Sequence, residues 1–120
     1  QGNAVFGSSN DLKGSLNKVA GGVNGVTGDE NTLVGSNSMI KGNANSLEGS
    51  DSAVRGDSNT VRGDLTMVNG HLNSAEGNAI RLKGSENIVS GDQNDVFGNV
   101  NSVNGAANRL AGNSNVIQGY

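Results

Sequence analysis

Residues 57–91 read DSNTVRG, DLTMVNG, HLNSAEG, NAIRLKG and SENIVSG, five consecutive blocks of seven. Each block ends in Gly and carries an aliphatic residue two places earlier. The same register extends in both directions, because Gly occupies every seventh position from Gly7 to Gly119. A strict internal period of this kind is typical of repeat proteins, in which each unit packs only against its neighbours.

The chain of 120 residues is a run of 17 heptads followed by one further residue. When Gly is numbered as the seventh residue, the fifth position is Val, Ile or Leu in 16 heptads and the third is Asn in 13. The consensus is therefore x-x-Asn-x-Val-x-Gly. It predicts a single repeat domain over residues 1–120, and the sequence shows no evident capping segment.

The heptads predict short β-strands and exclude a coiled coil. A coiled coil needs two apolar positions in each heptad and does not tolerate a Gly in every second helical turn, at about 1 kcal/mol each. Positions three to six instead alternate between inward and outward, with Asn and Val inward and Gly at the start of a turn. Each heptad is then one strand and one corner of a parallel β-solenoid, which is an all-β fold.

The exceptions at position three indicate how many heptads form one coil. The four exceptions are Ser38, Ser52, Thr66 and Ile80, and they fall in every second heptad. In a coil of three heptads they would be scattered over three different faces, whereas in a coil of two heptads they share one. The sequence thus predicts a two-sided β-roll of about 8.5 coils, each made of two heptads, that is about 40 Å long and has a thin Val, Leu and Ile core.

The other inward column at position three is predicted to be an unbroken ladder of Asn side chains. Stacked amides can donate to and accept from neighbouring coils, so a polar residue can be buried repeatedly without unpaired groups. This predicted structural ladder consists of Asn3, Asn17, Asn31, Asn45, Asn59, Asn73, Asn87, Asn101 and Asn115.

Composition argues against most catalytic and ligand-binding classes. The chain has no Cys and a single His, His71, which excludes a thiolate metal site, a His-pair metal motif and an ordinary Ser/His/Asp triad. We therefore expect no enzyme activity, no metal and no cofactor. The net charge of −3 argues against a generic nucleic-acid binder, and no apolar run approaches the length of a membrane span.

The heptads at 57–63 and 85–91 resemble the x-x-Asn-x-Val-x-Gly repeat of perennial-ryegrass-type antifreeze proteins, and the resemblance covers the whole chain. It implies a left-handed β-roll with an internal Asn ladder, and an extracellular, non-catalytic protein that binds ice through the outward residues of one sheet. The chain also resembles, more loosely, the Gly-punctuated head repeats of trimeric bacterial adhesins, which are β-rolls with coils of the same length.

We name the outward residues of the odd-numbered heptads face A and those of the even-numbered heptads face B. The resemblance implies an ice-contacting rank of short hydroxyls, and face A supplies one at position four of five heptads. These candidate ice-binding residues are Thr32, Ser46, Thr60, Ser74 and Ser102. Position six of face A places Glu48, Arg62 and Glu76 on successive coils, an alternation of charge that predicts a cross-strand charge ladder.

Face B is predicted to be basic. It carries six of the eight basic residues and two acids, for a charge of +4. The basic stripe consists of Lys13, Lys41, Arg55, Arg81, Lys83 and Arg109. Such a stripe is a solvated surface, or a site that attracts either an anionic polymer or an acidic edge of another subunit.

Two alternatives to ice binding follow from the repeat itself. Because 17 heptads make 8.5 coils, Val5 and Ile117 are expected at open ends of the solenoid. A second molecule could then stack head to tail, and such a non-closing contact produces a filament. The alternative functions are a structural protein that assembles into extracellular filaments and an adhesin repeat segment.

Overall fold

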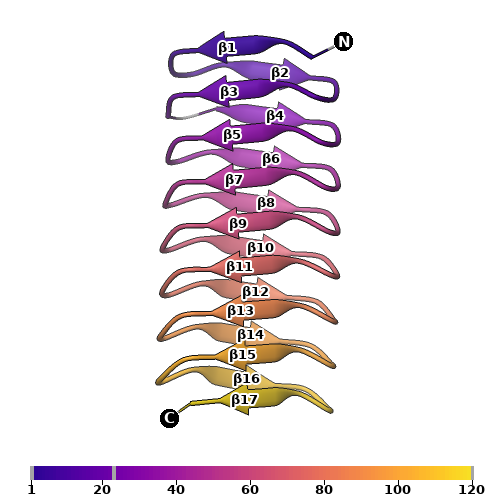
Figure 1. Ribbon diagram of the computed structural model, residues 1–120, viewed down its shortest axis with the longest axis vertical. Helices are drawn as coiled ribbons and strands as arrows, with labels where there is room; N and C mark the ends of the chain where they lie inside the picture. The colour runs from indigo at the N-terminus through magenta and orange to yellow at the C-terminus, as the bar shows by residue number, and fades with distance from the viewer. Residues whose placement is uncertain (1, 23, 120) are drawn as a thin grey trace.

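The computed structural model describes residues 2–22 and 24–119, and in these ranges the chain forms 17 three-residue strands and no helix. The strands alternate between two parallel sheets that lie back to back and are joined by a turn at each edge (Figure 1). Every strand pairs with the strand two heptads away. This register confirms the predicted two-sided β-solenoid of 14-residue coils, and its longest dimension is 41 Å.

Each heptad contributes one strand, and successive heptads belong alternately to the two sheets. The nine-stranded sheet contains β1 (Ala4–Phe6), β3 (Lys18–Ala20), β5 (Thr32–Val34), β7 (Ser46–Glu48), β9 (Thr60–Arg62), β11 (Ser74–Glu76), β13 (Ile88–Ser90), β15 (Ser102–Asn104) and β17 (Val116–Gln118). The eight-stranded sheet contains β2 (Asp11–Lys13), β4 (Gly25–Thr27), β6 (Met39–Lys41), β8 (Ala53–Arg55), β10 (Met67–Asn69), β12 (Arg81–Lys83), β14 (Asp95–Phe97) and β16 (Arg109–Ala111).

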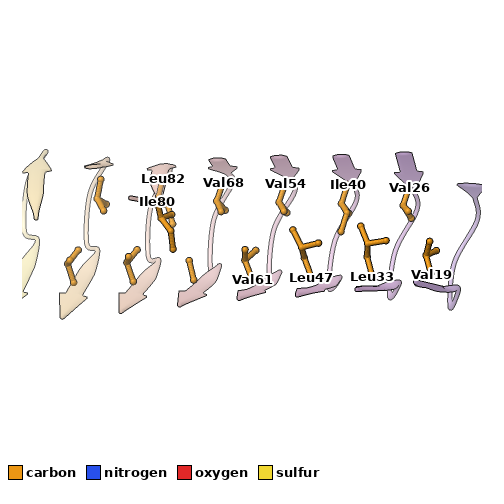
Figure 2. Packing of buried hydrophobic residues seen from close by; sticks show 14 residues of the cluster. Val19, Val26, Leu33, Ile40, Leu47, Val54, Val61, Val68, Ile80 and Leu82 are labelled. Carbon is orange, nitrogen blue, oxygen red and sulfur yellow. The ribbon is translucent and has the colours of Figure 1, made fainter. Parts of the chain in front are cut away.

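The core is a single layer of aliphatic side chains between the two sheets. The fifth residue of each heptad points inward, so that Leu33 and Leu47 of one sheet face Ile40 and Val54 of the other (Figure 2). From Val19 to Val103 every fifth-position residue is buried, which confirms the predicted alternation. Each coil buries only two such side chains. The fold therefore depends on continuous stacking of the coils and on hydrogen-bond partners for the backbone N–H and C=O groups of every coil.

The inward Asn column supplies hydrogen-bond acceptors for backbone N–H groups. The side-chain Oδ1 of each Asn from Asn17 to Asn115 accepts the backbone N–H of the Asn in the preceding coil, at 2.8–3.0 Å. All nine predicted Asn residues therefore join one ladder. The expectation that it leaves no unpaired group is wrong, because within the described residues the buried Nδ2 groups of Asn31, Asn45 and Asn73 have no hydrogen-bond partner. Asn3, in the first coil, is exposed.

The second inward column is interrupted where the sequence departs from Asn. The Oγ atoms of Ser38 and Ser52 still accept the N–H of the preceding coil, at 3.3 and 3.2 Å. Within the described residues, no side chain accepts the N–H of Ser52 or of Thr66. Ile80 instead joins the apolar core beside Leu82 (Figure 2). Between Ser52 and Ile80 this column therefore has fewer side-chain hydrogen bonds to the backbone, and Ile80 adds apolar contacts instead.

In the turns whose residues are all described, two residues adopt positive φ. Gly63, for example, has φ +148, and a Cβ there would overlap the carbonyl of Gly49 in the preceding coil. The second residue of the next heptad has φ near +60 even where it is not Gly or Asn, as at Leu65, Leu72 and Val100. At Leu65, Leu72 and Val100 the left-handed conformation carries no sequence signal, because these residue types disfavour it.

The sheet edges at the two ends of the solenoid are open within the described structure. β1 pairs only with β3, and β17 only with β15. Ile117 is 49% exposed, whereas the equivalent residue of β15, Val103, is fully buried. The head-to-tail filament stays a prediction. Among the described residues, no helix is long and apolar enough to cross a membrane.

Candidate functional site

The candidate site is face A, the outer surface of the nine-stranded sheet. The outward residues at position four lie in direct register on neighbouring strands, with Thr32 opposite Ser46, Ser46 opposite Thr60, and Thr60 opposite Ser74. All four side chains are exposed. Because strands in a sheet are about 4.8 Å apart, the four hydroxyls form a straight rank along the solenoid axis.

The fifth candidate hydroxyl is separated from this rank. Ser74 is followed by Ile88, which is 60% exposed, and Ile88 is followed by Ser102. The structure therefore brings together four of the five sequence-predicted ice residues and places Ser102 one strand beyond an apolar side chain. Within residues 2–22 and 24–119, none of the five hydroxyls makes a hydrogen bond to protein, which leaves them available to water.

A second column of longer side chains runs beside the rank. Arg62 donates from Nε to Oε2 of Glu76 at 3.0 Å, and both side chains are well exposed. Glu48 lies in register with Arg62 but forms no ion pair in the described part of the chain. The predicted charge ladder is thus realised by one pair. Exposed pairs of this kind contribute about 0–1 kcal/mol, so this column is not required for stability.

Two ladders of hydrogen bonds run along the turns at the edges of the solenoid, and the sequence analysis did not identify them. On one edge, Oδ1 of Asp29 accepts the N–H of Asn43 at 2.6 Å and Oδ1 of Asn43 accepts that of Asp57 at 2.7 Å. On the other edge, Asp64 and Asn78 act in the same way. These side chains at position one accept the turn N–H groups that the backbone ladder leaves free.

His71 belongs to the first of these ladders. Its backbone N–H donates to Asp57 at 2.6 Å, and its Nδ1 accepts the N–H of Ser85 at 3.1 Å. His71 is exposed in a turn, and its imidazole takes the acceptor role that a carboxylate or amide has in the neighbouring coils. The signal for this role was the recurrence of acceptor side chains at position one of the odd-numbered heptads from Ser15 to Asn113.

The side chains of the predicted basic stripe are all exposed on face B, the outer surface of the eight-stranded sheet. Lys41 and Arg55 are adjacent in register, and Arg81 and Lys83 lie on the same strand, β12. The basic stripe and the hydroxyl rank therefore occupy opposite sides of the solenoid. Groups of three or more metal-ligating side chains do not occur in the part of the chain that the structure describes.

Comparison with known proteins supports the repeat assignment. A family model described as a grass antifreeze β-roll matches residues 1–84, which are the first 12 of the 17 heptads. The matched region includes Thr32, Ser46, Thr60 and Ser74 and ends before Ser102. Comparisons with curated proteins and with solved structures gave no match.

Proposed function

The chain belongs to the grass antifreeze β-roll family, and from this premise we propose that it binds ice through face A and thereby inhibits ice recrystallisation. The role is non-catalytic. The observation that supports the proposal is the exposed rank of Thr32, Ser46, Thr60 and Ser74 in direct register on one flat sheet.

The proposed mechanism depends on rigidity and short side chains. Thr and Ser have few rotamers, so ordering them against a solid surface costs little conformational entropy. Their backbone is held by parallel pairing on both sides and by the inward Asn ladder. The rank can therefore hold water at a fixed repeat of about 4.8 Å before ice is met. The Thr methyl groups add small apolar contacts between these hydroxyls.

The charged column beside the rank restricts how ice can approach. Glu48, Arg62 and Glu76 are longer than Thr or Ser and are hydrated, because all three are exposed. The proposed contact is therefore a narrow one, centred on position four. A contact of this width favours inhibition of recrystallisation, in which adsorbed molecules slow the movement of ice boundaries.

We also propose an extracellular location. Binding to ice requires that the solenoid meets growing crystals in open water, and the family resemblance points the same way. Fractionation of the producing tissue into extracellular fluid and cell contents tests the location, since recovery of the chain only inside cells would contradict it.

The direct test of ice binding compares two variants that introduce Lys at the same heptad position. Thr60→Lys places a charged chain in the centre of the rank, whereas Met67→Lys places it on the next strand of the chain, which lies on face B. Thr60→Lys should abolish inhibition of recrystallisation, and Met67→Lys should leave it unchanged. The proposal is wrong if both variants keep the parent activity, or if the parent has none.

A further inference from the structure

Face B carries a group of cations without anionic partners. Lys41 and Arg55 lie opposite each other on β6 and β8, and Arg81 and Lys83 lie on β12. Among the described residues, no carboxylate lies within 4.0 Å of any of these four side chains. Position six of the strand between them is Asn69, in register with both Arg55 and Lys83. Asp95 of β14 lies in register with Arg81 and with Arg109 and offsets part of their charge. Among these four cations, those without an acid in register are therefore Lys41, Arg55 and Lys83, all at position six.

Two neighbouring grooves on face B are lined by these cations. One groove, of about 440 Å³, is lined by Met67, Val68, Asn69, Arg81, Lys83, Asp95 and Phe97. The adjacent groove, of about 270 Å³, is lined by Met39, Lys41, Arg55, Met67 and Asn69 among others. Both grooves include Met67 and Asn69 in their lining, so they lie next to each other along the solenoid axis over β6 to β14, and together they are called the trough. Its floor contains half-exposed methionine side chains, and cationic side chains stand along it.

The edges of the solenoid limit the width of any partner. Asp29 and Asp57 lie on one edge and Asp64 and Asp92 on the other, and each carboxylate is held by a backbone N–H at 2.6 Å. A partner wider than the three-residue strands of face B would meet these acids and be repelled. A bilayer or a nucleic-acid duplex is too wide. A single extended polymer chain lying along the axis avoids both edges.

We propose that face B binds one linear acidic polysaccharide, with a carboxylate on each sugar, laid along the trough. Its carboxylates pair with Lys41, Arg55 and Lys83 at position six, away from Asp95 at position four, while its sugar rings lie against the apolar side chains of Met39, Met67 and Phe97. The regular strand spacing suits a polymer with regularly spaced charges. Face B has no rank of aromatic side chains on which nucleic-acid bases would stack. The site is independent of the proposed ice-contact face, because it lies on the opposite sheet.

The test measures binding of fluorescently labelled polygalacturonate oligomers to the full chain by anisotropy. Arg55→Gln with Lys83→Gln removes one Arg and one Lys from face B. The matched control, Arg62→Gln with Lys18→Gln, removes the same two residue types from face A. The face B variant should bind about five- to tenfold more weakly, and the control should bind like the parent. Affinity of the parent should fall as salt rises from about 0.05 to 0.5 M.

Several outcomes would overturn the proposal: no binding by the parent, an equal loss in both double variants, binding that does not respond to salt, or equal binding of uncharged galactan. Tighter binding of single-stranded DNA or of phosphatidylserine vesicles would assign the trough to another class of partner and would equally refute it. All four substituted side chains are exposed, so folding should be retained, which thermal unfolding verifies. A negative result here leaves the ice assay of face A unaffected.

Discussion

The side-chain oxygen Oδ1 of Asn59 accepts the backbone N–H of Asn45, one coil earlier, at 2.8 Å. The amide Nδ2 of Asn59 in turn donates to Oδ1 of Asn73, one coil later, at 3.2 Å. A buried side chain thus satisfies a backbone group that parallel strand pairing leaves free. The repeated Asn is consequently part of the backbone hydrogen-bond network rather than a polar residue tolerated in the core.

Replacing Asn59 by Leu should destabilise the fold by about 2 kcal/mol or more, because the N–H of Asn45 would be buried without an acceptor. The control is Asn69→Leu, the same change at an exposed position of β10. Urea unfolding compares the two. Equal midpoints for Asn59→Leu and the parent would show that the ladder does not support the fold.

Introducing Asn into the interrupted column should stabilise the protein. Thr66→Asn offers an Oδ1 to the N–H of Ser52, and its Nδ2 can donate to the carbonyl of Gly63, as Asn24 does to Gly21 at 2.7 Å. We expect a gain of about 1 kcal/mol in the free energy of unfolding. Thr60→Asn, which points outward, is the matched control and should give no gain. Destabilisation by Thr66→Asn would mean that packing against Ile80 outweighs the new hydrogen bond.

Gly63→Ala should be among the most damaging single substitutions. Gly63 has φ +148, and a Cβ would overlap the carbonyl of Gly49. The expected cost is about 2–4 kcal/mol, from backbone strain and the forced separation of two coils. Gly25→Ala serves as the control, because the added Cβ would meet only Asp11 Oδ1, at an ordinary 3.5 Å. Differential scanning calorimetry should show a lowered transition for Gly63→Ala alone.

Val100 adopts φ +57 although it is β-branched, and its side chain is 56% exposed. Asn tolerates this conformation better, so Val100→Asn should stabilise the fold by about 1 kcal/mol. The reverse change, Asn37→Val, tests the same conformation at φ +57 and should lose a similar amount. Guanidinium unfolding of both variants checks the signs. If Val100→Asn lowers the midpoint, the left-handed turn residue does not carry this strain.

Removing the charged column from face A should improve ice binding. Glu48→Thr, Arg62→Thr and Glu76→Thr together would place a second hydroxyl rank beside the first. Inhibition of recrystallisation should then occur at a lower protein concentration. The control triple variant, Lys41→Thr, Arg55→Thr and Lys83→Thr, introduces three Thr at the same heptad position of face B. A face A variant no more active than the parent would show that the width of the hydroxyl surface does not limit the contact.

Periodicity alone was enough to derive the coil. The two-heptad spacing of Ser38, Ser52, Thr66 and Ile80 assigned them to one column, and the structure pairs every strand at that spacing. The inward direction of the third and fifth residues followed from strand alternation, since successive side chains point to opposite faces. The exposure of the hydroxyl rank and of the basic stripe follows from the same rule.

The tertiary structure alone decided what happens at the turns. The sequence shows acids and a histidine at position one, but only stacked coils place Asp57 beneath the N–H of His71. The left-handed conformation of Leu65 and Val100 opposes the preference of those residues, so it arises from the path that connects two sheets rather than from local propensity. The trough on face B likewise exists only because the strands from β6 to β14 are adjacent in space although each lies two heptads from the next in sequence. The repeated sequence determines the length of the coil and which side chains are buried, because both follow from strand alternation within one heptad. The contacts between coils depend on how closely the backbones of neighbouring coils stack.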